Sequence, residues 1–230
     1  MQRLIYGRRK GHRLRPGRQR LLAEVLPDLE VILPDSGPLD AAALFPGRDR
    51  LWLEIGSGGG EHLVAKALAN PQVGLIGGEP YVSGVARTLS LVQGHRLDNV
   101  RLFTDDVRLL MPVLPDACLE RIFVLFPDPW PKKRHHKRRI VNPATAAEFQ
   151  RLLRAGGELR LATDDMTYAR AMLLALRLCP AFRWQARRPA DWRARPSDSP
   201  PTRYENKALT AGRACVYLRF VRTATACESS

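Results

Sequence analysis

Apolar and polar residues follow one another in blocks whose lengths match strands and helices. Short apolar runs fit strands, and longer stretches with apolar residues every three or four positions fit helices. The expected strands cover residues 50–55, 73–79, 100–104, 121–126 and 158–163. The expected helices cover residues 19–26, 62–69, 82–94, 144–154 and 166–178, the fourth closed by two glycines at 156 and 157. From residue 50 onwards, strands and helices therefore alternate.

This alternation predicts a parallel sheet with helices on both of its faces. Two further runs, 182–187 and 214–221, predict a C-terminal antiparallel hairpin with a long Pro-rich loop between its strands. We therefore expect an α/β fold with a doubly wound, mostly parallel, seven-stranded sheet. Ligands of such sheets bind beyond the carboxyl ends of the strands, so residues at these ends are the candidates for a site.

The length and composition of the chain suit a single globular domain. There are 230 residues, 45% of them apolar, which is enough to bury a real core. We expect residues 1–20 to form a basic, flexible arm and residues 21–230 to form one domain. No apolar run could span a bilayer or act as a signal segment, which predicts a cytoplasmic protein. The four cysteines lack C-x-x-C spacing and neighbouring histidines, so we expect no metal site.

Positive charge is concentrated in two short segments of the chain. The formal net charge is +14; residues 1–20 hold eight Lys/Arg and no acid, and residues 132–139 hold six more. The rest of the chain is balanced, with 23 basic and 23 acidic residues. Two such patches indicate a polyanionic partner. A solubilising tail and a solvated loop are the alternative, which is weaker for the interior segment because packed like charges repel.

The first expected strand leads into a glycine-rich turn, LEIGSGGGEHL. Glu54 ends the strand, and Gly56, Gly58 and Gly60 follow it. Glycines let a backbone approach a ligand closely. The spacing misses the G-x-G-x-x-G of dinucleotide-binding enzymes, which argues against an NAD-dependent enzyme. It fits E-x-G-x-G-x-G, whose acid would repel a pyrophosphate but accept a hydrogen bond from the cationic end of S-adenosylmethionine.

The next two expected strands also end in acids. Glu79 ends the second strand, where a carboxylate can bind two ribose hydroxyls. Asp105 and Asp106 end the third; we choose Asp105 for the adenine amino group, while Asp106 either joins the cofactor site or caps the next helix. The glycine loop alone would indicate only a tight turn. Together with three successive strand-end acids, it predicts a cofactor site.

The fourth expected strand runs into FPDPWPKKRHHKRR, residues 126–139. Prolines stiffen its first half, which contains Asp128 and Trp130. Trp130 could stack on a base while Asp128 accepts hydrogen bonds from ring N–H groups, which predicts a base pocket. The basic half would then hold the phosphates around that base, since phosphate contacts position a nucleic acid and base contacts specify it.

These motifs, together with TRYENKAL near the C-terminus, closely resemble the bacterial tRNA (guanine-N7-)-methyltransferase family. The resemblance extends from YGRRKGHRLRPGRQ to YLRFVR, nearly the whole chain. It implies a Rossmann-like class I methyltransferase that uses S-adenosylmethionine to methylate a guanosine in the tRNA variable loop. The sequences GSGGG and GGE and the residue Pro131 depart from the family's commoner forms, but all the acids stay in register.

The resemblance also implies roles for single residues. Glu54, Glu79, Asp105 and Asp128 match cofactor-binding positions, and Asp128 also matches the catalytic acid. The positions that match substrate-binding residues are Lys132, Asp164, Thr202, Arg203, Tyr204 and Glu205, to which the pocket argument adds Trp130. The positions that match the RNA-contacting segment are Arg134, His135, His136, Lys137, Arg138 and Arg139. From the basic arm we add Arg8, Arg9 and Lys10 as a clamp on the tRNA backbone.

Two of the implied substrate residues also have a purely structural interpretation. Glu205 could pair with Lys207 while Tyr204 packs, and Asp164 could cap the helix that begins near Met166. As for the chemistry, guanine N7 has a lone pair and no proton, so its attack on a methyl group needs no general base. We expect catalysis mainly from alignment, with Asp128 or Asp164 stabilising the positive charge that develops on the ring.

Two other functions stay open on the sequence. One is methylation of a base exocyclic amine, because such sites commonly show an acid or Asn, two prolines and an aromatic residue, and DPW is a near match. The other is a non-catalytic RNA-binding protein with a vestigial cofactor site, against which the intact row of acids argues. In each case we expect RNA, here tRNA, as the partner, without membrane binding, and a monomer or homodimer.

Overall fold

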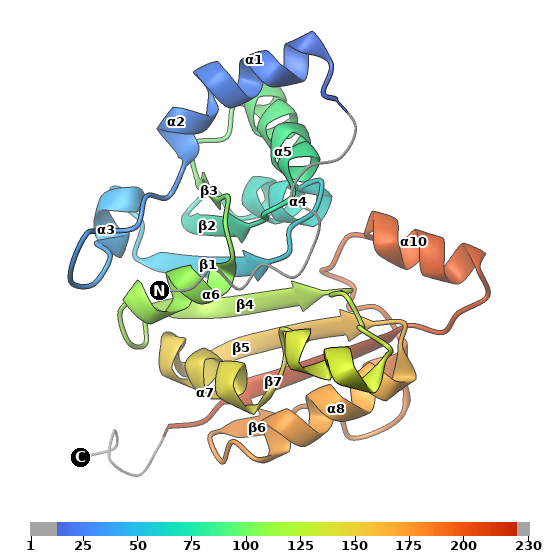
Figure 1. Ribbon diagram of the computed structural model, residues 1–230. Helices are drawn as coiled ribbons and strands as arrows, with labels where there is room; N and C mark the ends of the chain where they lie inside the picture. The colour runs from blue at the N-terminus through green and yellow to red at the C-terminus, as the bar shows by residue number, and fades with distance from the viewer. Residues whose placement is uncertain (1–12, 225–230) are drawn as a thin grey trace. The chain divides into compact units, whose positions relative to one another are not determined.

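The structure is a computed structural model, which describes residues 13–224 (Figure 1). Its strands form a seven-stranded mixed sheet in the order β3-β2-β1-β4-β5-β7-β6. This confirms the predicted α/β fold class. The chain divides into two compact units, Met1–Pro115 and Asp116–Ser230, each with its own strands and helices. No helix in the described part is long and apolar enough to cross a membrane.

The N-terminal unit is built on three parallel strands, β1 (Arg50–Ile55), β2 (Val73–Gly78) and β3 (Val100–Phe103). β2 lies between the other two, with Glu54 opposite Gly77 and Gly78 opposite Phe103. All six residues of β2 are buried. Burial on both faces explains why this strand is a continuous apolar run rather than an alternating one.

The helices of this unit begin with α1, which starts inside the segment that we expected to be a flexible arm. Residues 16–20 are helical, with Pro16 in the first position, where its missing N–H costs nothing. α1 packs against α5. The helices are α1 (Pro16–Glu24), α2 (Leu26–Leu29), α3 (Ala41–Leu44), α4 (Glu61–Ala69), α5 (Val82–His95), α6 (Val107–Leu110) and the 3₁₀ helix η1 (Met111–Val113).

The C-terminal unit contains β4 (Leu119–Leu125), β5 (Leu153–Thr163), β6 (Phe182–Trp184) and β7 (Val216–Arg222). β4 and β5 are parallel, whereas β7 is antiparallel to both of its neighbours, β5 and β6. The predicted antiparallel pair is therefore confirmed. β7 lies between β5 and β6, so the last strand of the described residues is an inner strand of the sheet.

The helices of the C-terminal unit include three, η2, α9 and α10, in segments where we expected loops. They are η2 (Lys133–Arg138), α7 (Pro143–Leu152), α8 (Met166–Arg177), α9 (Ala190–Arg193) and α10 (Arg203–Thr210). α7 begins at a capping box in which the Asn142 side chain and the Thr145 hydroxyl each accept the other residue's N–H. We expected it to reach residue 154. It ends at Leu152, because Leu153 already pairs with Leu119 in the sheet.

The carboxyl-terminal part of β5 has one apolar face and one charged face. In β5, Leu159 and Leu161 alternate with Glu158 and Arg160. α7 and α8 both pack against β5, as an apolar strand face requires. The alternation predicts a solvated charged face, but Glu158 and Arg160 are only 8% and 9% exposed. Asp198, in the segment between α9 and α10, pairs with Arg160.

Candidate active site

The glycine loop connects β1 to α4 and turns on residues with positive φ. Gly56, Gly58 and Gly60 have φ of 74°, 58° and 79°, a region that glycine enters without steric cost. A Cβ at Gly60 would also lie 2.5 Å from Thr88 Oγ1. The backbone therefore requires glycine here, whatever the loop binds.

Glu79, at the carboxyl end of β2, ties this loop to the start of α5. The N–H of Gly58 donates to Glu79 Oε2 at 2.7 Å, and the N–H of Tyr81 donates to Oε1 at 2.8 Å. The carboxylate is oriented in advance, as the predicted contact with a ribose needs.

Glu54, the acid at the end of β1, is paired inside the protein. Its Oε2 lies 2.7 Å from Nδ1 of His62, and the two side chains are only 5% and 3% exposed. We had expected Glu54 to accept from the cofactor directly and had given His62 no role. The structure makes His62, in the first turn of α4, the residue that orients Glu54. A direct contact between Glu54 and the cofactor stays a prediction.

Asp105 and Asp106 follow β3 and occupy different environments. Asp106 is 6% exposed and caps α6, accepting the N–H of Arg108 at 3.0 Å while its Oδ2 pairs with Arg108 Nη2 at 2.6 Å. Asp105 is half-buried and accepts the N–H of Asp106 at 2.7 Å. The capping role that the sequence left open for Asp106 is therefore confirmed. Asp105 is the acid better placed to meet a ligand.

In the C-terminal unit, Asp128 and Trp130 lie in the FPDPW turn (residues 126–130), which follows β4. Phe126 and Trp130 have φ of 51° and 43°, which costs about 1–3 kcal/mol for each non-glycine residue. The N–H of Phe126 donates to the Ala162 carbonyl at 2.8 Å, which fixes the start of the turn. Asp128 itself is exposed. Strain of this kind persists where the surrounding structure holds the backbone in place.

Arg139 supports the FPDPW turn from the protein interior. Its Nε donates to the Pro129 carbonyl at 2.8 Å, and its guanidinium lies 4.7 Å from the centroid of the Tyr168 ring. Arg139 is 4% exposed and Tyr168 is fully buried. Burial raises the pKa of Tyr168 to about 12, so its hydroxyl stays protonated and accepts the N–H of Val141 at 3.0 Å. We had expected Arg139 to contact RNA, but its burial makes it a support of the turn.

The other residues of the basic segment (residues 132–139) lie nearer the surface, and none of η2 is buried. The Arg138 guanidinium lies 4.9 Å from the centroid of the Trp130 ring, and the His135 ring meets the Trp130 ring edge-on with 5.9 Å between centroids. Partial burial and the neighbouring cations Arg138 and Arg134 lower the pKa of His135. Lys132, Arg134 and Lys137 are exposed, and His136 is half-buried.

Two acids follow β5, and the second of them is the helix cap. Asp165 Oδ1 accepts the N–H of Tyr168 at 2.7 Å at the start of α8. The capping role considered for Asp164 therefore belongs to its neighbour. Asp164 Oδ2 accepts from Arg213 Nε at 2.7 Å, and its side chain is 26% exposed.

The TRYE motif (residues 202–205) forms the start of α10. Thr202 Oγ1 accepts the N–H of Glu205 at 3.1 Å and Glu205 Oε2 accepts the N–H of Thr202 at 3.3 Å, which is a capping box. Glu205 is 3% exposed, lies 3.0 Å from Arg195 Nε and accepts a hydrogen bond from the Tyr217 hydroxyl. Tyr204 is 54% exposed and Arg203 is exposed. The structure thus gives Glu205 other partners than Lys207 and leaves more than half of the Tyr204 surface exposed.

Comparison with known proteins places the chain in a family. The tRNA (guanine-N(7)-)-methyltransferase of Rhodospirillum rubrum is 55% identical over 228 residues, which covers 97% of this chain and 89% of that protein. The enzyme of the same name from Nitrobacter winogradskyi is 50% identical, covering 96% and 87%. A family model described as "Putative methyltransferase" matches residues 48–218. The chain belongs to the tRNA (guanine-N(7)-)-methyltransferase family.

Membership in this family confirms the resemblance that the motifs indicated and makes the protein a methyltransferase. Solved structures show the same fold at low identity. The 16S rRNA methyltransferase KamB superposes with a TM-score of 0.55 at 13% identity, covering 82% of this chain and 96% of that one. The 16S rRNA (adenine(1408)-N(1))-methyltransferase of Catenulisporales acidiphilia gives 0.54 at 16%, covering 85% and 95%. At these identities the likeness concerns the fold alone.

Several residues that contact the predicted site residues were not themselves predicted from the sequence. His62, Tyr168, Arg195, Arg213 and Tyr217 each contact a predicted site residue or its supporting arginine. Their partners lie far away along the chain, so no local spacing indicates them. Arg8, Arg9 and Lys10 lie outside the described residues. In the described part no group of three or more His, Cys, Asp or Glu side chains could hold a metal ion.

Proposed function

We propose that the protein transfers the methyl group of S-adenosylmethionine to N7 of a guanosine in the variable loop of tRNA, giving 7-methylguanosine. The observation that carries this proposal is the row of acids at the carboxyl ends of successive strands. Glu79 follows β2, Asp105 follows β3 and Asp128 follows β4. In α/β sheets, ligands bind beyond the carboxyl ends of the strands, and the names of the relatives supply the chemistry.

The N-terminal unit has the features that a nucleoside cofactor needs. Gly58 and Glu79 hold one another, so a carboxylate oriented by two backbone N–H groups is ready for the ribose hydroxyls. Asp105 would accept from the adenine amino group. A Cβ at Gly56 would meet nothing within 4 Å, so the loop leaves space beside its first glycine. Bound S-adenosylmethionine would supply the electrophilic methyl group, and these residues would bind and orient it.

The C-terminal unit offers an acid for the charge that the reaction creates. N7 needs no deprotonation, but the guanine ring becomes cationic as the methyl group is transferred. Asp164 is already paired with Arg213, whereas Asp128 is exposed in a rigid turn. We therefore assign the stabilisation of the developing charge to Asp128 rather than to Asp164. Preorganised charges of this kind act mainly on the transition state.

The exposed cations of the basic segment would hold the tRNA backbone. Lys132, Arg134 and Lys137 are exposed and follow Asp128 closely in the sequence. Partial burial and the neighbouring cations both lower the pKa of His135. Phosphate contacts fix the register of a nucleic acid, and a pocket then selects the base. The exposed Tyr204 and Arg203 of the TRYE motif would add contacts to the nucleotide.

Product analysis tests the proposal directly. The purified protein is incubated with unmodified tRNA and S-adenosylmethionine labelled in its methyl group, and the labelled nucleoside is identified after digestion. We expect label in 7-methylguanosine, and a rate about 10²-fold lower in Asp128→Ala, the loss typical for removal of one charge-stabilising group. Asp116→Ala is the matched control, because Asp116 is an exposed acid of the same unit, paired with Arg151.

The other outcomes separate the alternatives. Label on an exocyclic amine would keep the fold and the cofactor but overturn the N7 chemistry. Tight tRNA binding without any label would support the non-catalytic RNA-binding protein. Asp128→Ala with normal turnover would remove Asp128 from the mechanism while leaving the reaction itself in place.

A further inference from the structure

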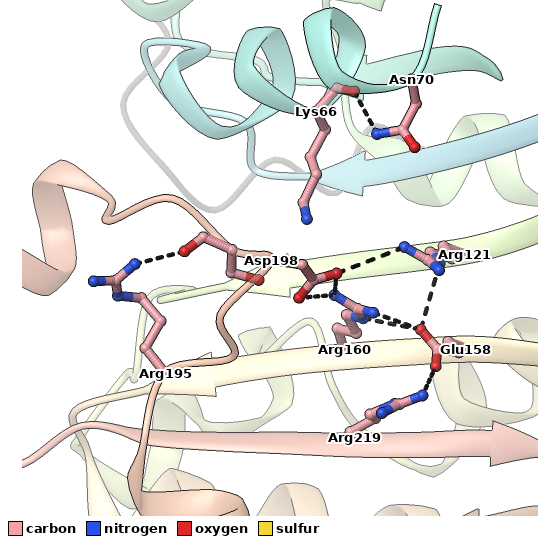
Figure 2. A network of polar contacts seen from close by, with 9 residues as sticks. Lys66, Asn70, Arg121, Glu158, Arg160, Arg195, Asp198 and Arg219 are labelled. Carbon is pink, nitrogen blue, oxygen red and sulfur yellow. Dashed lines mark hydrogen bonds and ion pairs between the residues drawn. The ribbon is translucent and has the colours of Figure 1, made fainter. Parts of the chain in front are cut away.

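The charged face of the C-terminal strands carries a network of ion pairs centred on Glu158 (Figure 2). Glu158 Oε2 accepts from Arg160 Nη2 at 2.8 Å and from its Nε at 3.0 Å, and Arg121 Nε lies 3.4 Å from the same oxygen. Arg219 pairs with the other oxygen, Oε1. Three strands, β4, β5 and β7, therefore contribute to one network.

Asp198 joins this network from outside the sheet. It belongs to the anchored loop (residues 194–202), which connects α9 to α10. Its Oδ2 and Oδ1 lie 2.7 and 3.0 Å from Arg160 Nη1, and its Oδ2 lies 3.9 Å from Arg121 Nη1. Figure 2 shows Asp198 and Glu158 at opposite sides of the Arg160 guanidinium. Arg160 thus fastens the loop to the sheet.

Glu158 and Asp198, the two acids bound to Arg160, differ in how much their removal would destabilise the protein. The side chains of Arg160 and Glu158 are 11% and 10% exposed, whereas that of Asp198 is 49% exposed. A buried charge left without a partner is strongly destabilising. Arg160 would keep Glu158 if the loop were released, so no isolated buried charge would result. Asp198 is therefore the part of the network that can be removed without disrupting the sheet.

A second contact joins the start of the anchored loop to the TRYE motif. Arg195 Nε lies 3.0 Å from Glu205, and Arg195 Nη1 donates to the Ser199 carbonyl at 2.5 Å. Pro196, Pro200 and Pro201 restrict the backbone between these contacts. Two anchors and three prolines in nine residues leave the loop little freedom. Its last residue, Thr202, is the N-cap of α10.

We propose that Arg160 and Asp198 are positioning residues for the substrate, because their salt bridge fixes the loop whose end sets the place of the TRYE motif. Neither residue touches the reacting atoms in this assignment. Both act through Thr202 and the first turn of α10, where Tyr204 and Arg203 are exposed for contact with the nucleotide. The inference rests on the proposed function, since it assumes that the TRYE motif binds the tRNA substrate.

Kinetics of Asp198→Asn test the assignment, with both substrates varied in turn. We expect the KM for tRNA to rise about tenfold, the loss typical of one charge-assisted hydrogen-bonded pair, while kcat and the KM for S-adenosylmethionine change less than about twofold. Asp198→Glu, which keeps the charge, should recover most of the loss. The double variant Arg160→Gln/Asp198→Asn should be no worse than Arg160→Gln alone, because both remove the same interaction.

Asp116→Asn is the matched control for this experiment. It breaks another Asp–Arg pair of the same unit, to Arg151 at 2.6 Å, that has no link to the anchored loop. We expect its KM values to equal those of the wild type. Hydrogen exchange supplies a readout that does not need activity: amides of residues 197–206 should exchange faster in Asp198→Asn, and those of β5 should not.

Each remaining outcome decides a separate question. An active wild type with an unchanged KM for tRNA in Asp198→Asn overturns this inference alone. Equal losses for tRNA and S-adenosylmethionine, with faster exchange in β5, also overturn it, because they indicate a general structural role. A wild type that forms no 7-methylguanosine overturns the proposed function, and unchanged exchange at residues 197–206 would then refute the anchoring as well.

Discussion

The two units of this protein hold their candidate ligand-binding residues by different physical means. In the N-terminal unit, backbone N–H groups orient Glu79 and positive-φ glycines shape the loop. In the C-terminal unit, guanidinium groups hold the corresponding parts: Arg139 supports the FPDPW turn, Arg213 pairs with Asp164 and Arg195 pairs with Glu205.

This difference follows the ligands proposed for each unit. A small cofactor with a fixed set of hydroxyl and amino groups suits a site defined by backbone, whose geometry changes little. A polyanionic tRNA suits a site that contains arginine–carboxylate pairs with partly exposed arginines, such as Arg195 and Arg213, because phosphates can compete for these guanidinium groups. Four experiments test this comparison.

Gly60→Val should abolish the cofactor site altogether. The substitution combines a φ of 79° with a Cβ that would lie 2.5 Å from Thr88 Oγ1, so both backbone strain and overpacking result. We expect a loss of stability of about 2–4 kcal/mol and no detectable S-adenosylmethionine binding by calorimetry. Gly94→Ala, where a Cβ meets nothing within 4 Å and φ is not positive, should bind normally. Normal binding by Gly60→Val would show that the loop adapts.

Glu79→Ala should weaken cofactor binding without affecting tRNA. It removes a carboxylate that the backbone has already oriented, and we expect S-adenosylmethionine affinity to fall about 100-fold, equivalent to two hydrogen bonds of a charged group. Calorimetry measures this loss, and filter binding of tRNA should be unchanged. Glu61→Ala, which breaks only the partly exposed pair with Arg87, is the control and should bind both ligands normally. A comparable loss of tRNA affinity in Glu79→Ala would contradict the division between the units.

Arg139→Met and Arg134→Met should separate two roles within the basic segment. Arg139 is buried behind the turn, so its loss leaves the Pro129 carbonyl without its donor, and we expect kcat to fall about tenfold with normal tRNA affinity. Arg134 is exposed, so its loss should weaken tRNA binding and reduce the salt dependence of the affinity by about one phosphate contact. Titration of tRNA at several salt concentrations checks both. If Arg139→Met lowered the salt slope instead, Arg139 would be an RNA contact after all.

Glu158→Gln should change how the free energy of unfolding depends on pH, because Glu158 is the central carboxylate of the ion-pair network. Burial by itself would raise the pKa of Glu158. The guanidinium groups of Arg160, Arg219 and Arg121 outweigh this effect and hold the pKa below its ordinary value of 4.5. A lowered pKa in the folded state stabilises the protein above pH 4.5, and this stability is lost as the pH falls through the folded value.

We therefore expect the free energy of unfolding of the wild type to exceed that of Glu158→Gln by about 1–3 kcal/mol at pH 7. This difference should become smaller below pH 4.5. Urea unfolding at a series of pH values measures it. Glu24→Gln is the control, since Glu24 forms only an exposed pair with Arg20 and should show no such change. A gap that widened on acidification would contradict the sign of this coupling.

Much of the fold follows from the sequence because its signals are local. Five strands were predicted from short, mostly apolar stretches bounded by turns, and all five appear, although β5 begins five residues early. That strand start was not predictable because the pairing of Leu153 with Leu119 is a contact between distant residues. α10 was missed for a different reason: its capping box, Thr202 and Glu205, was interpreted as a substrate motif rather than as a helix start.

For the site, the sequence determined which residues lie at strand ends. It also determined the family to which the protein belongs. Glycines, strand-end acids and the FPDPW turn are local features, so their identity could be read from the chain. Only the tertiary structure decided which charged side chains are buried and which residues they contact. Glu54 with His62, Arg139 with Pro129, and Arg160 with Asp198 each join residues that are eight or more positions apart. Burial and pairing depend on how distant segments pack, and sequence spacing carries no such information.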